Sequence, residues 1–438
     1  MIYDPYFCAT FTICFLAILL YRLSIEGYAL LMRFAALFHP KARLWVQGRR
    51  GLLAQLQAEL PGRIKHRPVA WFHAASLGEF EQGRPVIEAF RLQYPEYFIF
   101  LTFFSPSGYE VRKNYAGADY VTYLPIDSPT HARQLVQLLQ PQIAFFIKYE
   151  FWHFYLRELR QNHAVILSFS AIFRPGQLFF KPYGQFYRNI LLYFNHLFVQ
   201  NKESEELLKD AGIQDVTIAG DTRFDRVGQL AEAARKLPEI AAFVGSLPCL
   251  IVGSAWEADR AVLVSALSGL SFPIKTIVAP HEIHEADLQR WEQTLPGKTL
   301  RYSVYTSPQF DVASLSSYSN LLIDNIGMLS SLYRYGHVAY IGGAFGAGLH
   351  NILEAATYGL PVLFGNRNYL KFQEAVDLCS QGGALALPDS EACRAALTEL
   401  LTDLELRTKR GKINQAYVQA HRGATAAVMK QVEKLLKS

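Results

Sequence analysis

The feature that most restricts the fold is a regular alternation of short apolar segments with longer helical patterns. Each apolar segment precedes a helical pattern of about 10 to 15 residues, which is typical of parallel sheets built from βαβ units. The plan occurs twice along the chain, so we expect two similar α/β domains. The predicted strands are residues 70–73, 98–102, 120–123, 143–147, 164–168 and 196–199 in the first half, and 249–252, 275–279, 321–323, 337–341, 361–363 and 384–387 in the second.

These segments predict the domain organisation of the 438-residue chain. Two α/β domains joined by a linker place a cleft where the carboxyl ends of their strands meet, and we expect ligands to bind there. The predicted parts are a membrane anchor (1–38), an amino-terminal domain (39–220), a linker (221–248) and a carboxyl-terminal domain (249–438) that includes terminal helices.

The amino terminus has the composition of a membrane anchor. Pro5–Tyr21 is a run of 17 residues without a charge. As a helix it would reach roughly 25 Å, just under the ~30 Å of a hydrocarbon core. Arg22, Glu26 and Arg33 interrupt the apolar stretch that follows. We therefore expect either a single short span or a helix that lies in the membrane interface.

A basic segment follows the predicted anchor. Seven cations between residues 39 and 70 are opposed by Glu59 alone. By the positive-inside rule this segment stays in the cytoplasm, together with the globular part of the chain. The segment is either a solvated linker or a surface that attracts anionic lipid headgroups or an acidic substrate. Its cations are Lys41, Arg43, Arg49, Arg50, Arg63, Lys65 and Arg67.

Composition excludes several other classes of protein. Five cysteines are scattered without a Cys-x-x-Cys pair or a metal spacing, which indicates a reducing compartment and no disulfide framework. The net charge of +5 is modest for this length, and we expect no nucleic-acid partner. Hydrophobic residues make up 51% and charged residues 18%, which is consistent with a lipid contact.

The segment from Val69 to Glu88 has the pattern of a ligand site. An apolar strand leads into a loop of small residues that includes Ser76 and Gly78, and a helix-forming run then opens with Glu79 in its first turn. Parallel α/β proteins build sites at such corners, and the helix dipole there favours a charged carboxylate. The alternative is that Glu79 is only a first-turn helix residue.

Two strand ends in the second half carry polar residues. Gly253–Glu257 follows a strand and opens a helix, so its backbone N–H groups and the Ser254 hydroxyl could bind a phosphate. An ordinary helix N-cap explains the same residues. His281 stands after another strand at the same edge, where it is either a ligand contact or a surface histidine in a turn.

The most informative stretch is Tyr340–Phe364. A strand leads into a glycine-rich loop, and Asn351 and Glu354 then lie three residues apart on one face of the next helix. Glycines let backbone donors approach an anion, and an Asn/Glu pair suits the hydroxyls of a ribose or a sugar. A loop without a binding role is the alternative. The loop glycines are Gly342, Gly343, Gly346 and Gly348.

These motifs together resemble a known family, the 3-deoxy-D-manno-octulosonic acid (Kdo) transferases of lipopolysaccharide assembly. The resemblance covers nearly the whole chain, and its first and last motifs are specific. It implies the GT-B fold, with two Rossmann-like domains. The motifs are F-H-A-A-S-L-G-E at 72–79, K-Y-E-F-W at 148–152, G-D-T-R-F-D at 220–225, G-S-A-W-E at 253–257 and G-G-x(7)-H-N-I-L-E-A-A at 342–356.

The resemblance implies roles for the residues of these motifs. Glu79 would be the general base that deprotonates the acceptor hydroxyl, and Glu150 would support it or position the acceptor. No metal and no cofactor are expected, because helix N-termini and backbone N–H groups would stabilise the leaving phosphate. The implied acceptor contacts are Ser76, Gly78 and Lys148, and the implied donor contacts are Ser254, Glu257, His281, Gly342, Gly343, Asn351 and Glu354.

The chain departs from the family pattern at two places. Many relatives carry an Arg-His pair where this chain has His281-Glu282, so the cation that meets the donor could be His281, Arg260 or Arg223. Tyr149 stands where relatives often have Thr or Ser.

The resemblance predicts a glycosyltransferase that moves Kdo from CMP-Kdo to a lipid A precursor at the cytoplasmic face of the bacterial inner membrane. Its partners would be CMP-Kdo, the lipid A precursor (lipid IVA) and inner-membrane lipids. Two alternatives remain: a GT-B enzyme that uses a UDP-sugar, such as an N-acetylglucosamine transferase or an epimerase, and a non-catalytic nucleotide-binding protein at the membrane.

Overall fold

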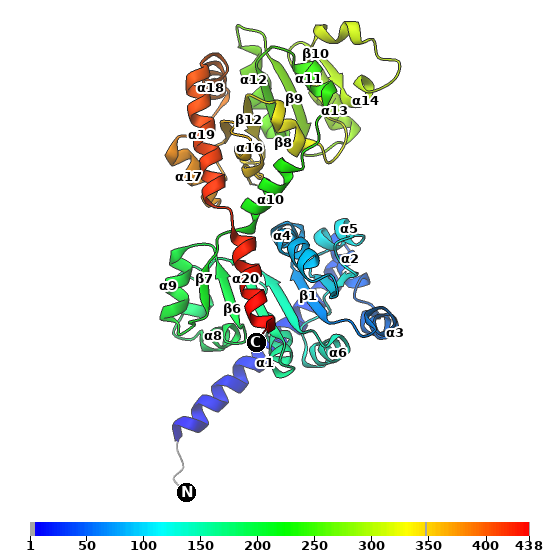
Figure 1. Ribbon diagram of the computed structural model, residues 1–438, viewed down its shortest axis with the longest axis vertical. Helices are drawn as coiled ribbons and strands as arrows, with labels where there is room; N and C mark the ends of the chain where they lie inside the picture. Colours follow the sequence, from blue (N-terminus) through cyan, green and yellow to red (C-terminus); the bar gives the residue numbers. More distant parts are fainter. Residues whose placement is uncertain (1–4, 347, 438) are drawn as a thin grey trace. The chain divides into compact units, whose positions relative to one another are not determined.

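The computed structural model of the protein describes residues 5–346 and 348–437, with side chains from residue 16 onward. The chain forms two compact units, each built around a parallel sheet of seven strands (Figure 1). The first unit contains the residues up to Arg226 together with Arg422–Ser438, and the second contains Val227–His421.

The first sheet has the strand order β3-β2-β1-β4-β5-β6-β7. β1 pairs with both β2 and β4, so the direction of the connections reverses between β1 and β4. Such a reversal is the switch point at which open parallel sheets bind ligands. The strands are β1 (Val69–Ala74), β2 (Phe98–Phe103), β3 (Tyr120–Tyr123), β4 (Ile143–Ile147), β5 (Val165–Ala171), β6 (His196–Val199) and β7 (Val216–Ile218).

The second sheet repeats this plan in the order β10-β11-β9-β8-β12-β13-β14. β8 pairs with both β9 and β12, which places its switch point between β8 and β12. The strands are β8 (Cys249–Ala255), β9 (Lys275–Pro280), β10 (Lys298–Arg301), β11 (Tyr318–Leu322), β12 (Val338–Ile341), β13 (Val362–Gly365) and β14 (Ala384–Leu387).

Helices cover both faces of the first sheet, which is why its central strands are apolar along their whole length. All residues of β1, β2 and β4 are buried. One face packs against α3 (Leu52–Ile64), α6 (Pro129–Leu139), α7 (His153–Gln161), α8 (Gln185–Leu191) and α9 (Lys202–Asp210). The other face packs against α4 (Leu77–Gln93) and α20 (Ala424–Lys437). Smaller elements at the edge are α2 (Pro40–Gln47) and α5 (Pro106–Arg112).

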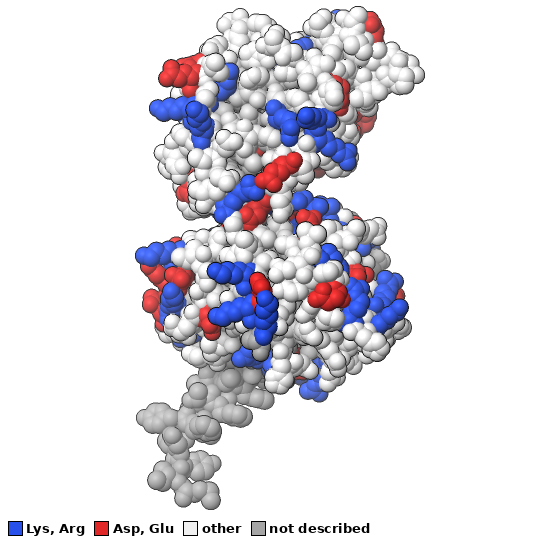
Figure 2. All heavy atoms as spheres, viewed as in Figure 1, with Lys and Arg blue, Asp and Glu red and all other residues white. Residues whose placement is uncertain are grey.

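The second sheet has the same layered construction. One face packs against apolar residues of α12 (Glu257–Ser268), α13 (Glu285–Thr294) and α18 (Ser390–Thr402). The remaining helices of this unit are α11 (Pro238–Val244), α14 (Tyr302–Tyr305), α15 (Leu329–Leu332), α16 (Leu353–Thr357), α17 (Gln373–Gln381) and α19 (Leu404–Ala420). On the face drawn in Figure 2, cations and anions are intermixed over each unit.

The chain ends in the first unit, which corrects the predicted domain boundaries. α20 packs its apolar residues Val428, Met429 and Val432 into the core of the first sheet, although the sequence placed residues 422–438 in the second domain. The predicted linker 221–248 is largely helical: it contains α11 and α10 (Thr222–Glu232), and α10 crosses the boundary between the two units.

Twelve of the fourteen described strands lie at or next to their predicted positions, and the two missed strands are edge strands. β7 and β10 are each hydrogen-bonded to one neighbouring strand only. The other edge of each strand faces away from the sheet, so its residues need not be apolar. Two of the three residues of β7 are exposed, and β10 contains the exposed Lys298. Neither segment therefore has the apolar pattern from which a strand is predicted.

The first helix, α1 (Pro5–Ala35), is attached to the first unit by two tyrosines. The Tyr21 hydroxyl donates to the buried Asp127 carboxylate at 2.6 Å, and the Tyr28 ring packs on the Trp45 ring with centroids 5.7 Å apart. Among the residues that the structure describes, no helix is long and apolar enough to cross a bilayer. Much of the expected span, Pro5–Tyr21, falls on residues that this finding does not cover; beyond it, Arg22 and Glu26 pair at 2.8 Å. The side chains of residues 1–15 lie outside the described part.

His153, at the start of α7, is buried where α1 meets the sheet. The rings of Tyr21 and Phe186 lie 5.8 and 5.0 Å from its own, and neither imidazole nitrogen has a hydrogen-bond partner among the described residues. Burial, reinforced by Arg157, lowers the pKa of His153 to about 4. The imidazole is therefore neutral in the folded protein at neutral pH.

This burial predicts a pH-dependent effect of His153→Phe. The unfolded chain binds a proton at His153 near pH 6.5, whereas the folded chain resists it down to about pH 4. The stability that neutral His153 contributes is thus complete above pH 6.5 and is lost as the pH falls toward 4. Between pH 7 and pH 5 the variant should gain about 2 kcal/mol over the wild type, measured by urea unfolding at each pH. Parallel pH profiles would contradict the assignment.

Candidate active site

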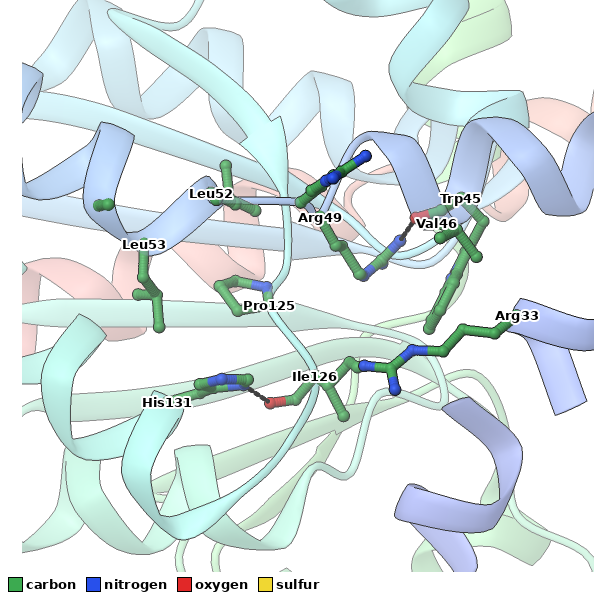
Figure 3. Close-up of a pocket in the computed structure, with 12 residues that line it drawn as sticks. Arg33, Trp45, Val46, Arg49, Leu52, Leu53, Pro125, Ile126 and His131 are labelled. Carbon is green, nitrogen blue, oxygen red and sulfur yellow. Dashed lines mark hydrogen bonds between the residues drawn. The ribbon is translucent and has the colours of Figure 1, made fainter. Parts of the chain in front are cut away.

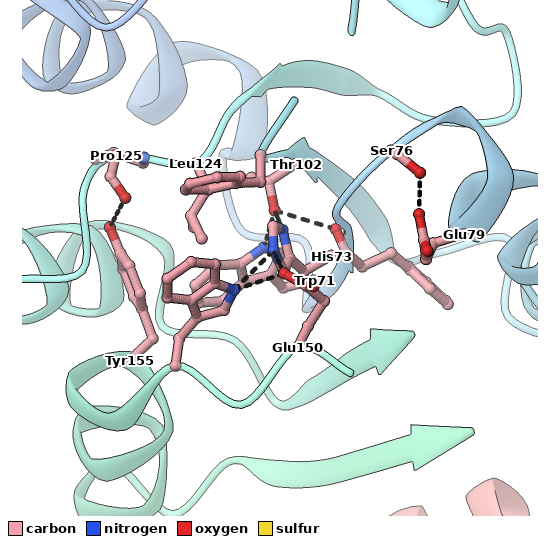
Figure 4. Close-up of polar contacts among 12 residues, drawn as sticks. Trp71, His73, Ser76, Glu79, Thr102, Leu124, Pro125, Glu150 and Tyr155 are labelled. Carbon is pink, nitrogen blue, oxygen red and sulfur yellow. Dashed lines mark hydrogen bonds and ion pairs between the residues drawn. The ribbon is translucent and has the colours of Figure 1, made fainter. Parts of the chain in front are cut away.

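The corner between β1 and α4 places Glu79 at the carboxyl edge of the first sheet (Figure 4). β1 ends at Ala74, Ser76 precedes α4 with an extended backbone, and Glu79 lies in the first helical turn. The Ser76 hydroxyl donates to the Glu79 carboxylate. Glu79 is partly exposed and Gly78 is exposed, so the carboxylate can be reached from solvent. The helix dipole favours a negative charge at this position.

Glu150 follows β4, the strand on the other side of the switch point. Its Oε2 atom accepts from His73 Nε2 at 2.9 Å and from Trp152 Nε1 at 2.7 Å. The carboxylate is nearly buried, with 11% of the side chain exposed. Lys148, two residues earlier, has a left-handed backbone (φ 68°), which turns the chain sharply at the strand end. Glu79 and Glu150 thus flank one switch point, as the predicted pairing of these two motifs requires.

A buried chain of hydrogen bonds fixes the tautomer of His73. Trp71 Nε1 can only donate, and it donates to Thr102 Oγ1 at 2.8 Å. The same oxygen lies 2.8 Å from His73 Nδ1 and 3.4 Å from the Phe72 carbonyl oxygen. His73 Nε2 faces the Glu150 carboxylate, which only accepts, so the imidazole proton is on Nε2 and Nδ1 accepts from the Thr102 hydroxyl (Figure 4). His73 and Thr102 stand opposite each other on β1 and β2, which is why they meet.

At the second switch point, a buried aspartate holds the glycine-rich loop. Asp259 in α12 accepts from the backbone N–H groups of Trp256 and Gly343, both at 2.9 Å, and from the Tyr340 hydroxyl at 3.0 Å. The loop after β12 is thereby tied to the first turn of α12. The approach is close: a Cβ on Gly342 would stand 2.5 Å from Ser254 O. Ser254 itself has a left-handed backbone (φ 53°).

Three aromatic rings stack beside this loop. The Trp256 and His281 rings are 4.1 Å apart, and those of His281 and His350 are 4.6 Å apart. Trp256 Nε1 donates to His350 Nε2 at 2.9 Å, so the proton of His350 is on Nδ1. Burial, with the charge of His281 adding to it, lowers the pKa of His350 to about 4, and burial also lowers the pKa of His281. The stack is therefore uncharged at neutral pH and carries no cation for an anionic ligand.

The structure brings some predicted donor residues together and separates others. Ser254, His281 and the Gly342–Gly343 pair meet at the second switch point. Asn351 stands at the start of α16, where its side-chain oxygen accepts from Leu353 N at 3.1 Å and its amide lies 3.3 Å from Glu354.

Other predicted residues are occupied elsewhere. Glu257 is exposed and forms an ion pair with Arg260 of the same helix. Arg223 lies in the first unit, where it pairs with Asp221 at 2.9 Å.

Cations that the sequence did not single out lie against the glycine-rich loop. Asn368 binds the loop twice, through its backbone N–H to Ala344 O at 3.0 Å and through its side chain to Gly346 O at 2.6 Å. These contacts hold the segment after β13 beside the loop backbone. A Cβ on Gly348 would stand 2.9 Å from the Lys371 ammonium, so this cation touches the loop. Arg367 lies over the Phe345 ring at 5.8 Å.

No motif in the sequence pointed to Lys371, because only the fold brings the segment after β13 against the loop after β12. His73, Thr102 and Asp259 were missed for a related reason, since each acts through a partner that is distant in the sequence. Among the described residues, no group of three or more His, Cys, Asp or Glu side chains has a metal-binding arrangement. The expectation that no metal or cofactor is needed stays a prediction.

Comparison with known proteins finds similarity to the Kdo transferases. Residues 46–226 match the family model described as 3-deoxy-D-manno-octulosonic-acid transferase (kdotransferase). The 3-deoxy-D-manno-octulosonic acid transferase of Chlamydophila psittaci is 25% identical over 382 residues, covering 82% of this chain and 81% of that protein. The transferase of the same name from Bordetella pertussis is 25% identical and covers 83% of this chain and 86% of its own.

Solved structures show the same fold at lower sequence identity. The UDP-GlcNAc 2-epimerase of Neisseria meningitidis, bound to UDP-GlcNAc, aligns with a TM-score of 0.58 at 16% identity, over 84% of this chain and 100% of that chain. MurG of Acinetobacter baumannii aligns with a TM-score of 0.53 at 12% identity, over 84% and 99%. These likenesses show the GT-B fold alone. Together with the sequence matches, they confirm the predicted resemblance to the Kdo transferases and the fold of two Rossmann-like domains.

The close approach at Gly342 predicts a selective effect of added methyl groups. In Gly342→Ala the new Cβ would meet the backbone of Ala255 and Ser254, at 2.4 and 2.5 Å, and the strand end must shift. We expect the free energy of unfolding of the second unit to fall by about 1–3 kcal/mol. Gly346→Ala is the matched control, because its Cβ would have no neighbour closer than 3.9 Å. Urea unfolding monitored by hydrogen exchange in α12 and β12 measures both, and equal effects would contradict this account.

Proposed function

We propose that this glycosyltransferase moves Kdo from CMP-Kdo to a lipid A precursor, lipid IVA, at the cytoplasmic face of the bacterial inner membrane. The names of the curated relatives support Kdo as the transferred sugar. The proposed catalytic mechanism rests on Glu79, whose carboxylate is accessible to solvent at the start of α4, beside the switch point of the first sheet. The cations of the basic segment Lys41–Arg67 favour a phosphorylated acceptor, because they attract phosphate groups.

Glu79 is the general base in this proposal. The acceptor hydroxyl attacks the anomeric carbon of Kdo, and Glu79 takes the hydroxyl proton as the new C–O bond forms. The bond between the anomeric carbon and the phosphate oxygen breaks, and CMP leaves with the bonding electron pair. The hydrogen bond from Ser76 is local, because the two side chains are three residues apart. Glu79 can therefore exchange this donor for the substrate hydroxyl without disturbing the core.

Glu150 orients the acceptor in this proposal. Both of its donors, His73 and Trp152, act on the same oxygen, Oε2. No hydrogen bond to Oε1 is found among the described residues, so this oxygen is available to accept from a sugar hydroxyl. Ser76, Gly78 and Lys148 stand at the same edge of the sheet and complete the proposed acceptor contacts.

The second unit binds the CMP part of the donor in this proposal. Ser254 supplies a hydroxyl just before the N-terminus of α12, which suits a phosphate. The N–H groups of Gly342 and Gly343 bind Gly253 O and Asp259, so this pair shapes the loop around the donor. Asn351 and Glu354 suit the ribose hydroxyls, and His281 offers an aromatic face. Backbone N–H groups and Lys371 would stabilise the departing phosphate, so the proposal includes no metal.

A UDP-sugar enzyme is the nearest alternative. The solved structure named for UDP-GlcNAc shares only 16% identity with this chain, so it supports the fold without indicating the nucleotide. The curated relatives named for Kdo transfer are 25% identical over more than four fifths of the chain. We therefore favour the cytidine nucleotide, and a comparison of CMP with UDP separates the two alternatives.

Glu79→Gln tests the catalytic proposal. The wild type, incubated with CMP-Kdo and tetraacylated lipid IVA, should give products heavier by Kdo in mass spectrometry. The variant keeps the size of the side chain and loses the base, so its transfer rate should fall by about 10²–10⁴-fold. Its affinity for CMP and its unfolding curve should not change.

Glu96→Gln is the matched control for this test. Glu96 is an exposed glutamate just beyond the end of α4, and its variant should transfer at the wild-type rate. Substantial transfer by Glu79→Gln would remove Glu79 from the role of base. A wild type that forms no Kdo product would contradict the proposed function as a whole.

Lys371→Gln tests the proposed donor site. The wild type should bind CMP more tightly than UDP in calorimetry, and loss of the cation beside Gly348 should weaken CMP binding by about tenfold. Lys298→Gln, on the edge strand β10 of the same sheet, is the matched control and should bind CMP like the wild type. Tighter binding of UDP would favour the alternative function, and unchanged CMP binding by Lys371→Gln would place the donor phosphate elsewhere.

A further inference from the structure

The first unit contains a cavity of about 590 Å³ that no step above uses. It lies between the end of α1, the α2–α3 corner and the segment that follows β3 (Figure 3). Its apolar walls come from Trp45, Val46, Leu53 and Ile126. Its charged lining is cationic, since the lining residues include three arginines and no carboxylate: Arg33, Arg49 and Arg50.

Arg49 is a structural part of the wall. Its guanidinium donates to the carbonyl oxygens of Leu124, Trp45 and Phe104 at 2.9, 3.1 and 2.7 Å. It also lies 4.1 Å from the centroid of the Trp45 ring. Burial lowers the pKa of Arg49 to about 9, and each of its three nitrogens donates to one carbonyl of the fold. Arg49 therefore holds the α2–α3 corner against the sheet and is not free to bind a ligand.

Arg33 and Arg50 differ from Arg49 in that both are exposed. Neither side chain has a hydrogen bond, ion pair or ring contact with another described residue. In Figure 3 the Arg33 side chain reaches across the cavity toward Ile126. Two guanidinium groups beside apolar walls suit a ligand that is anionic at one end and apolar at the other. The guanidinium fork binds phosphate oxygens in particular.

The helix that supplies Arg33 also carries exposed apolar side chains. Leu31 and Phe34 of α1 are 67% and 65% exposed, and Phe38, just after α1, is 76% exposed, with its ring 5.6 Å from that of Phe34. Large exposed apolar side chains on one segment mark a binding surface. An exposed apolar segment, together with a cavity that has apolar walls and a cationic lining, has the chemistry of a lipid contact. A free phosphate would need the cations but not the apolar walls.

The cavity wall is continuous with the Glu150 cluster. Arg49 binds the Phe104 carbonyl, the Phe104 ring packs on Trp152 with centroids 4.9 Å apart, and Trp152 donates to Glu150. A lipid held in the cavity would therefore keep its polar head at the carboxyl edge of the first sheet, where the acceptor sugar is needed.

We propose that this cavity binds the phosphate group and the adjoining acyl chain of a phosphorylated lipid, with Arg33 and Arg50 on the phosphate and Trp45, Val46 and Leu53 along the chain. The inference rests on the proposed function and deepens it, because it assigns where the lipid part of the acceptor is held. Lipid binding itself can be measured without CMP-Kdo, so the two proposals can fail separately.

The first test measures binding of the full-length protein to phosphatidylcholine vesicles with and without phosphatidic acid. The variant Arg33→Gln/Arg50→Gln should lose about tenfold or more in binding to the phosphatidic acid vesicles, from about 1 kcal/mol per cation. The control Arg133→Gln/Lys430→Gln removes the same charge from exposed positions of the first unit that do not line the cavity. The control should lose much less, and equal losses would reduce the effect to general surface attraction and overturn the proposal.

The second test fills the cavity and keeps every charge. Ala54 lines the cavity and is exposed, so Ala54→Trp should fold normally. Wild-type protein should bind dihexanoyl phosphatidic acid in calorimetry, and Ala54→Trp should not. Inorganic phosphate should bind neither protein measurably. Equal binding of inorganic phosphate and the short-chain lipid would assign a free-phosphate site and overturn the proposal.

The third test connects the cavity with transfer. Arg33→Gln/Arg50→Gln should raise the KM for lipid IVA by about tenfold, the loss expected from two cations, and leave the KM for CMP-Kdo unchanged. A wild type that transfers Kdo, with variants whose acceptor KM does not change, would overturn this inference and leave the proposed function intact. Light scattering that shows a dimer broken by Ala54→Trp, without any lipid binding, would instead assign the cavity to an interface between copies of this chain.

Discussion

The site depends on one constraint, the reversal of strand order in the middle of each parallel sheet. β1 pairs with β2 and β4, and β8 pairs with β9 and β12, so the connections from neighbouring strands leave in opposite directions. The space above the carboxyl ends is then free of the sheet's own crossovers. Non-glycine residues with left-handed backbones occur at these ends, at Lys148, Ser170 and Ser254. Sharp turns at the strand ends bring the loops back over the edge of the sheet.

In each unit a buried polar side chain forms hydrogen bonds to groups at neighbouring strand ends. His73 connects β1 with Thr102 of β2 and with Glu150 after β4. Asp259 connects the first turn of α12 with Tyr340 of β12 and with Gly343. A buried group left without its partner costs about 1–3 kcal/mol, so each network favours one arrangement of the loops. Buried hydrogen bonds thus fix the geometry of the loops, while Glu79 at the first switch point stays partly exposed.

The sequence predicted the central strands and the motifs at their ends because both are local patterns. Continuous apolar runs mark strands buried on both faces, and small residues mark the turns that follow them. The edge strands β7 and β10 lack that pattern because one side of each has no neighbour. The ion pairs of Glu257 with Arg260 and of Arg223 with Asp221 were likewise not evident from the sequence. Lys371, His73 and α20 act through contacts with distant parts of the chain, and a single sequence does not reveal these contacts.

The two carboxylates of the first unit differ in how firmly they are held, and this difference favours different roles for them. Glu150 receives two N–H donors, from His73 and Trp152, and the chain that orients His73 begins at the buried Trp71. Moving this carboxylate would leave buried donors unsatisfied, so it suits a fixed acceptor of hydrogen bonds. Glu79 is partly exposed and receives a side-chain hydrogen bond from its neighbour Ser76 alone among the described residues. A base must exchange partners as it takes a proton, and at this sheet edge Glu79 can do so without breaking a buried network.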